Sequence, residues 1–132
     1  MKTKSILVLE DNADVIAHIR TMLVGLEHTA GLRFRAVEFA HVYEAEAYLE
    51  IHHDDIFDVI LLDKTDAAGE SYHRLDLKRL GMEKIISISS VARSNAEART
   101  LGVTRVIQKD YAGLDAFAAQ LSEEIVTMTG GR

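Results

Sequence analysis

The chain of 132 residues contains no cysteine, no proline and no tryptophan, and aromatic residues make up only 6% of it. Without cysteine it can form neither a disulfide framework nor a thiolate metal site. No apolar stretch is long enough to span a membrane, and the apolar run near the start, residues 5–9, is too short for a secretory signal. These absences predict a soluble protein of the cytoplasm that makes no membrane contact.

The sequence also lacks any cluster of basic residues, since 15 lysines and arginines stand against 21 acids for a net charge of −6. A dedicated nucleic-acid surface is therefore not expected. Hydrophobic residues at 48% and charged residues at 27% are typical of a folded globular protein. We expect one domain over residues 1–132, with its core at 4–128 and no output domain.

Short apolar runs alternate five times with stretches of helical periodicity. The expected strands are residues 4–9, 32–39, the run 59–62 closed by Asp63, 84–89 and 103–108. The expected helices are one capped by Asp11 or Asn12 and ended at Gly31, then residues 41–51, 70–80, 94–101 and 114–128. Five such units predict an α/β fold, a doubly wound parallel sheet with right-handed crossovers.

Polar side chains follow four of the five expected strands. In the stretch FDVILLDKTD, Asp63 closes an apolar run typical of a strand that is buried on both faces. Glu10 and Asp11 follow the first strand, Ser89 ends the fourth and Lys109 follows the fifth. In the flavodoxin-like strand order 2-1-3-4-5, these strand ends gather at one crevice, at the edge where open α/β sheets bind ligands.

The residue types indicate what this crevice would do. Glu10, Asp11 and Asp63 repel one another when ionised, and Mg²⁺ is a cation that relieves such repulsion. Asp63 would then attack a phosphoryl group as a carboxylate nucleophile. Lys109 would supply a positive charge and Ser89 a hydrogen bond to the phosphoryl oxygens. The pattern predicts a phosphoryl-accepting site.

Over residues 4–128 the chain resembles the receiver (CheY-like) domain of two-component response regulators. The resemblance is carried by the acidic pair Glu10–Asp11, Asp58 and Asp63 around the third strand, Ser89, Gly102 and Lys109. It implies that Asp63 is the phosphorylated aspartate and Ser89 the switch hydroxyl. It further implies that Asp11, Asp63 and the backbone carbonyl of Thr65 bind Mg²⁺ directly, while Glu10 acts through a water.

Some positions depart from the family pattern. Asp110 stands where a proline usually follows the lysine, so we expect a trans peptide bond there. The loop after the aspartate reads DKTDAAG, without proline and shorter than usual, and it adds charges at Lys64 and Asp66. Val106 replaces the aromatic switch residue, for which Tyr111 is a substitute to consider. The chain is an atypical receiver by sequence.

The resemblance implies a function in a phosphorelay. A sensor histidine kinase or a phosphotransfer protein would phosphorylate Asp63 with Mg²⁺, and the signal would pass through protein contact, with a homodimer left open. The chain would promote its own aspartyl phosphorylation and dephosphorylation without being an enzyme in the ordinary sense. The alternative is a pseudo-receiver, an interaction or dimerisation module without phosphorylation. A flavodoxin-like cofactor binder fits less well, because EDNAD follows the first strand where a phosphate loop would lie.

Several residues have simpler interpretations. Asp63 alone could cap a turn, and Glu10 and Asp11 could cap the first helix. Ser90 competes with Ser89 as the switch hydroxyl, whereas Ser87 is expected to pack or hydrogen-bond within its strand. The run of residues 52–55, HHDD, is expected to be a solvated turn and not a metal site.

Overall fold

The computed structural model describes residues 2–63 and 71–130. Its strands form one parallel sheet in the order β2-β1-β3-β4-β5. The strands are β1 (Lys2–Leu9), β2 (Leu32–Phe39), β3 (Val59–Asp63), β4 (Ile85–Ser89) and β5 (Arg105–Gln108). The predicted α/β fold and its strand order are confirmed.

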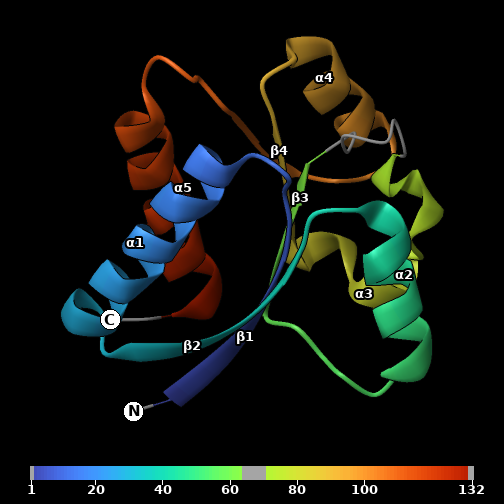
Figure 1. The fold of residues 1–132 in the computed structure, drawn as a ribbon, viewed down its shortest axis with the longest axis horizontal. Coiled ribbons are helices and arrows are strands. Elements are labelled where there is room, and N and C mark those ends of the chain that lie inside the picture. The colour runs from blue at the N-terminus through green and yellow to red at the C-terminus, as the bar shows by residue number, and fades with distance from the viewer. Residues whose placement is uncertain (1, 64–70, 131–132) are drawn as a thin grey trace.

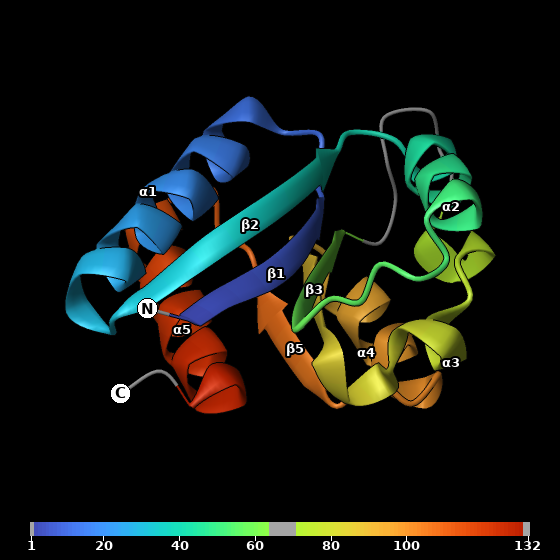
Figure 2. The same cartoon turned by 90° about the horizontal axis from the view of Figure 1, so that it is seen from below.

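The helices cover both faces of this sheet. One face carries α1 (Ala13–Thr29) and α5 (Leu114–Thr129), and the other carries α2 (Val42–Ile51), α3 (Leu77–Leu80) and α4 (Ala92–Thr100) (Figure 1). Seen from below, the twisted sheet separates the two layers, with β2 at its edge (Figure 2). Because all five strands are parallel, their carboxyl ends lie at one edge of the sheet.

The central strand β3 is apolar throughout because both of its faces are buried. Ile60 and Leu62 pack into the core beneath α2 and α4, while Val59 and Leu61 pack into the core beneath α1 and α5. The start of β3 is fixed by Asp58, whose Oδ2 accepts a hydrogen bond from the N–H of Ser5 at 2.8 Å. This register brings the last residue of the strand to the carboxyl edge of the sheet.

The prediction of one helix over residues 70–80 is wrong in its described part. The chain forms a 3₁₀ turn, Tyr72–Arg74, and only then the single-turn helix α3. Asp76 explains the break, because its side chain accepts a hydrogen bond from the N–H of Arg79 and so caps a new helix. A second 3₁₀ turn, Met82–Lys84, leads into β4.

Other element ends differ by about two residues from the sequence prediction. The helix α4 begins two residues earlier than expected, and β5 begins two residues later. At the start of α1 the predicted cap is confirmed for Asn12, whose Oδ1 accepts hydrogen bonds from the N–H groups of Asp14 and Val15 at 3.0 and 3.1 Å. This cap holds the first turn of α1 next to the acidic residues that follow β1.

Candidate functional site

The carboxyl end of β1 delivers two acidic side chains to the edge of the sheet. Glu10 is only 1% exposed, and Asp11 is half-buried. Oε2 of Glu10 accepts hydrogen bonds from the backbone N–H groups of Asp11 and Asn12, both at 3.1 Å. Hydrogen bonds of this kind to a charged acceptor are strong, so the turn into α1 holds the Glu10 carboxylate in place.

The carboxyl end of β3 brings a third carboxylate to the same place. Asp63 pairs in register with Ile88 of β4, and its side chain is 14% exposed. Carboxylate oxygens of Glu10, Asp11 and Asp63 all lie within 4.8 Å of one another. In residues 2–63 and 71–130, these acids are the one group of three or more with the spacing of metal ligands. Like charges this close need a cation or a proton among them.

The cation that the structure provides is Lys109, which directly follows β5. Its side chain is 1% exposed, and its Nζ lies 2.7 Å from Oε1 of Glu10 and 3.3 Å from Oδ1 of Asp63. Its backbone N–H donates to the carbonyl of Ser89 at 2.9 Å. The exposed ring of Tyr111 has its centre 5.8 Å from Nζ. One buried ammonium thus contacts two of the three carboxylates, Glu10 and Asp63, and the cluster keeps an excess of negative charge.

This excess charge shows in the acid–base properties of the cluster. Burial and the nearby charge of Glu10 raise the pKa of Asp63 to about 6, against the pull of Lys109. Burial disfavours the Lys109 ammonium, but its hydrogen bond to Glu10 and the surrounding carboxylates outweigh that cost and raise the pKa of Lys109. At neutral pH Asp63 is therefore mostly ionised, but with a pKa of about 6 it takes up a proton at a higher pH than an ordinary aspartate does.

The end of β4 supplies the hydroxyl group predicted for this edge. Ser89 is buried, and its Oγ accepts a hydrogen bond from the N–H of Val91 at 3.1 Å. The competing residue Ser90 is exposed. Ser87 lies in the middle of β4 and makes a hydrogen bond, as predicted: its Oγ lies 3.3 Å from Oδ1 of Asn95 in α4. Burial beside the backbone of Lys109 favours Ser89 over Ser90 at the site.

Two buried polar residues near the site were not identified from the sequence as part of it. Asn95 is 5% exposed, and its Nδ2 donates to the carbonyl of Ser89 at 3.2 Å. Tyr72 is fully buried, and its hydroxyl lies 3.2 Å from Oγ of Ser87. The available signal for Asn95 was its helical spacing, since it lies three residues before Ala98, the buried alanine of α4.

Some predicted features fall outside the described residues or at the rim. The proposed ligand Thr65 and the charges of Lys64 and Asp66 lie outside the described residues. The bond between Lys109 and Asp110 is trans, as predicted. Asp110 instead makes a turn, because its Oδ1 accepts a hydrogen bond from the N–H of Ala112 at 2.9 Å.

The segment 52–55 was predicted to be a solvated turn, and this is wrong for Asp55. Its carboxylate accepts hydrogen bonds from Arg35 and from the hydroxyl of Tyr48. The guanidinium of Arg35 also lies over the ring of Phe57 at 5.5 Å from its centre. These contacts tie β2, α2 and the start of β3 together. Asp55 therefore has a structural role, and the candidate site consists of the acids at the carboxyl edge of the sheet.

Several solved structures with a similar fold are response regulators. The Mn²⁺-bound form of Rcp1 has a TM-score of 0.70 and 17% identity, over 94% of this chain and 92% of that one. The phosphorylated cyanobacterial phytochrome response regulator RcpA has a TM-score of 0.68 and 22% identity, over 94% and 91%. The chain has the receiver-domain fold. A chain from the complex of the CheA3 P1 domain with CheY6 of R. sphaeroides reaches a TM-score of 0.65 and 25% identity, over 96% and 97%.

No protein-family model and no curated protein sequence matches the chain. No helix in residues 2–63 and 71–130 has the length and apolar character of a membrane span.

Proposed function

We propose that the chain is a cytoplasmic phosphorelay receiver that accepts a phosphoryl group on Asp63 from a sensor histidine kinase or a phosphotransfer protein. The observation that supports it most is the convergence of a buried lysine with three carboxylates from β1 and β3. A structural role accounts for the ion pair between Lys109 and Glu10. It does not account for Asp63, a further carboxylate held in the same cluster at the cost of a raised pKa.

A divalent cation suits this donor set. Three carboxylates within 4.8 Å and one ammonium leave negative charge to neutralise, and Mg²⁺ prefers hard oxygen ligands. We assign Asp11 and Asp63 as its direct ligands, because both oxygens of Glu10 already accept hydrogen bonds. Thr65 stays the proposed backbone ligand. When bound, Mg²⁺ would reduce the repulsion between the carboxylates and an incoming phosphoryl group.

Asp63, Lys109 and Ser89 each have a separate role in the proposed phosphoryl transfer. Lys109 contacts Oδ1 of Asp63, so we assign the attack on phosphorus to Oδ2. A new O–P bond forms while the P–N bond to the donor imidazole breaks, and its electron pair stays on the ring nitrogen. The Lys109 ammonium then faces the phosphoryl oxygens. The hydroxyl of Ser89, which accepts from Val91, keeps its own proton to donate to one of them.

The signal would leave this edge through contact with another protein. An open hollow there is lined by Ser90, Gln108, Lys109, Asp110, Tyr111 and Ala112. Tyr111 is 52% exposed, and Val91, next to Ser90 at the start of α4, is 53% exposed. Large apolar side chains exposed beside a reactive site are typical of surfaces that bind proteins. We assign this surface, near α4, to the downstream partner.

The alternative is a pseudo-receiver that binds a protein without being phosphorylated. Two observations favour it: Nζ of Lys109 lies closer to Glu10 than to Asp63, and Val106 occupies the place of the aromatic switch residue. In that case the ion pair serves stability alone. The receiver proposal explains more of the cluster, because it also accounts for Asp11 as a metal ligand and for Asp63 as the phosphoryl acceptor.

The test is phosphorylation by small donors. Acetyl phosphate and phosphoramidate are each incubated with the protein, with and without Mg²⁺, and the intact mass is measured. We expect a Mg²⁺-dependent gain of one phosphoryl group in the wild type and in Asp58→Asn, which changes the carboxylate at the other end of the same strand. Asp63→Asn should show no gain. Equal phosphorylation of Asp63→Asn would exclude Asp63 as the acceptor, and no mass gain with either donor would favour the pseudo-receiver.

A further inference from the structure

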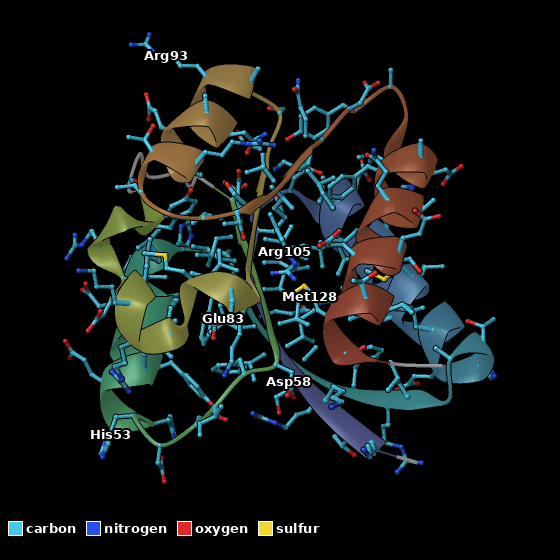
Figure 3. The ribbon with its side chains drawn as sticks, turned by 180° about the vertical axis from the view of Figure 1, so that it is seen from behind. His53, Asp58, Glu83, Arg93, Arg105 and Met128 are labelled. Carbon is cyan, nitrogen blue, oxygen red and sulfur yellow. The ribbon has the colours of Figure 1, made fainter. Side chains whose placement is uncertain are left out.

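The helix α4 lies on the sheet with little apolar surface to hold it there. Among its nine residues only Asn95 and Ala98 are buried. Arg93 points away from the molecule into solvent (Figure 3). The N-cap residue, Val91, makes no side-chain capping bond. Because one buried methyl group contributes little packing, the position of α4 depends on its polar anchor, Asn95.

Asn95 is the end of a buried chain of side-chain hydrogen bonds. The hydroxyl of Ser87 donates to Oδ1 of Asn95 at 3.3 Å, and the hydroxyl of Tyr72 lies 3.2 Å from the Ser87 oxygen. Since Ser87 has one hydroxyl proton and gives it to Asn95, Tyr72 is the donor in the second bond. The chain runs in one direction, from Tyr72 through Ser87 to Asn95, so each bond polarises the next.

The other end of the Asn95 amide reaches the backbone of the candidate site. Its Nδ2 donates to the carbonyl of Ser89, and the same carbonyl accepts from the N–H of Lys109 at 2.9 Å. The hydroxyl of Ser89 accepts from Val91, just before α4. Ser89 is therefore shared between the first turn of α4 and the lysine that contacts Glu10 and Asp63.

We propose that Asn95 is a positioning residue that couples α4 to the acidic site, with Ser87 and Tyr72 fixing the orientation of its side-chain amide. A displacement of Ser89 or Lys109 moves the carbonyl to which Asn95 is bound. The buried amide must follow or lose its partner, and a buried amide without a partner is unfavourable. This coupling rests on the proposed function only in taking Asp63 as the group whose state changes.

The coupling is measured by amide hydrogen exchange in α4, with the chemical shift of the Lys109 amide reporting the site. Two perturbations are compared: Mg²⁺ with acetyl phosphate, and the substitution Asp63→Asn without any ligand. Each is applied to the wild type, to Asn95→Leu and to Ser87→Ala. The matched control is Thr100→Ala, which removes an exposed hydroxyl bonded to the carbonyl of Ala96 on the same helix.

We expect each perturbation to change exchange rates in α4 by about fivefold or more in the wild type and in Thr100→Ala. The change should be lost in Asn95→Leu and in Ser87→Ala, while the Lys109 amide still responds. Ser87→Ala removes a single oxygen, so it decides the matter if Asn95→Leu fails to fold. An undiminished α4 response in both variants, or none in the wild type on Asp63→Asn, overturns the proposal. If acetyl phosphate has no effect, but Asp63→Asn changes hydrogen exchange in α4 only when Asn95 is present, the coupling is supported and the proposed phosphoryl transfer is not.

Discussion

Replacing Asp63 by asparagine is expected to stabilise the protein at neutral pH, although it removes a contact with Lys109. The reason is that the folded state holds the Asp63 carboxylate beside Glu10 and away from water, which raises its pKa to about 6 from the ordinary 3.8. Between these values the folded protein binds a proton that the unfolded chain has released. The contribution of this group to stability is therefore present at low pH and is lost as pH rises.

The size of the effect follows from the two pKa values. Ionisation of Asp63 lowers the free energy of unfolding by about 1 kcal/mol at pH 4.5 and by about 3 kcal/mol at pH 7, where the effect levels off. Asparagine resembles the protonated carboxyl group, and Lys109 keeps Glu10 as its partner in the variant. The free energy of unfolding of Asp63→Asn should thus exceed that of the wild type by up to about 3 kcal/mol at pH 7.

Urea unfolding of both proteins from pH 4.5 to 8, without divalent metal, tests this reasoning. With an m-value of about 1–3 kcal/mol/M, the urea midpoint of the variant at pH 7 should be higher by about 1–3 M. The gap should narrow as pH falls. Asp54→Asn, which changes an exposed carboxylate, serves as the control and should stay within about 0.5 kcal/mol of the wild type. A gap that is independent of pH, or a variant less stable than the wild type at pH 7, would show that the folded state does not raise the pKa of Asp63.

Three further predictions concern the charges around this site and a distant control. Lys109→Met should lower the free energy of urea unfolding by about 3 kcal/mol or more, because it leaves the Glu10 carboxylate buried without its cation. Adding Glu10→Gln to this variant should recover part of the loss. If the two substitutions instead destabilise the protein additively, the prediction is contradicted. Mg²⁺ should raise the melting temperature of the wild type, and a chelator should reverse this, whereas Asp11→Asn should show no such rise. Equal shifts in both proteins would exclude Asp11 as a metal ligand. Tyr48→Phe should cost about 1 kcal/mol by losing its hydrogen bond to Asp55 and should leave the Mg²⁺ response unchanged.

The sheet and the acidic cluster were predictable because both follow from local sequence patterns. A strand buried on both faces reads as a continuous apolar run, and this located β3 and placed Asp63 at its end. Parallel strands align their carboxyl ends, so the residues after β1, β3 and β5 were expected to meet. Glu10 and Lys109, 99 residues apart, do meet, at 2.7 Å.

What the sequence did not reveal depends on contacts made only after folding. The pattern placed Lys109 among three acids but did not say that it lies closest to Glu10. Asp76 carries a capping side chain within an otherwise helical pattern, and its bond to Arg79 decided that the third helix would break. Asn95 looked like an ordinary polar residue of an alanine-rich helix, because its partners Ser87 and Ser89 belong to a neighbouring strand.

The proposed receiver function requires Asp63 to form an acyl phosphate, and the most direct measurement is to locate that bond. The protein is treated with acetyl phosphate and Mg²⁺, reduced with borohydride, which converts an aspartyl phosphate to homoserine, and digested for tandem mass spectrometry. We expect homoserine at position 63 only when both Mg²⁺ and the donor are present. Homoserine at Asp11 or at another aspartate, or phosphorylation that borohydride does not reduce, would contradict this assignment.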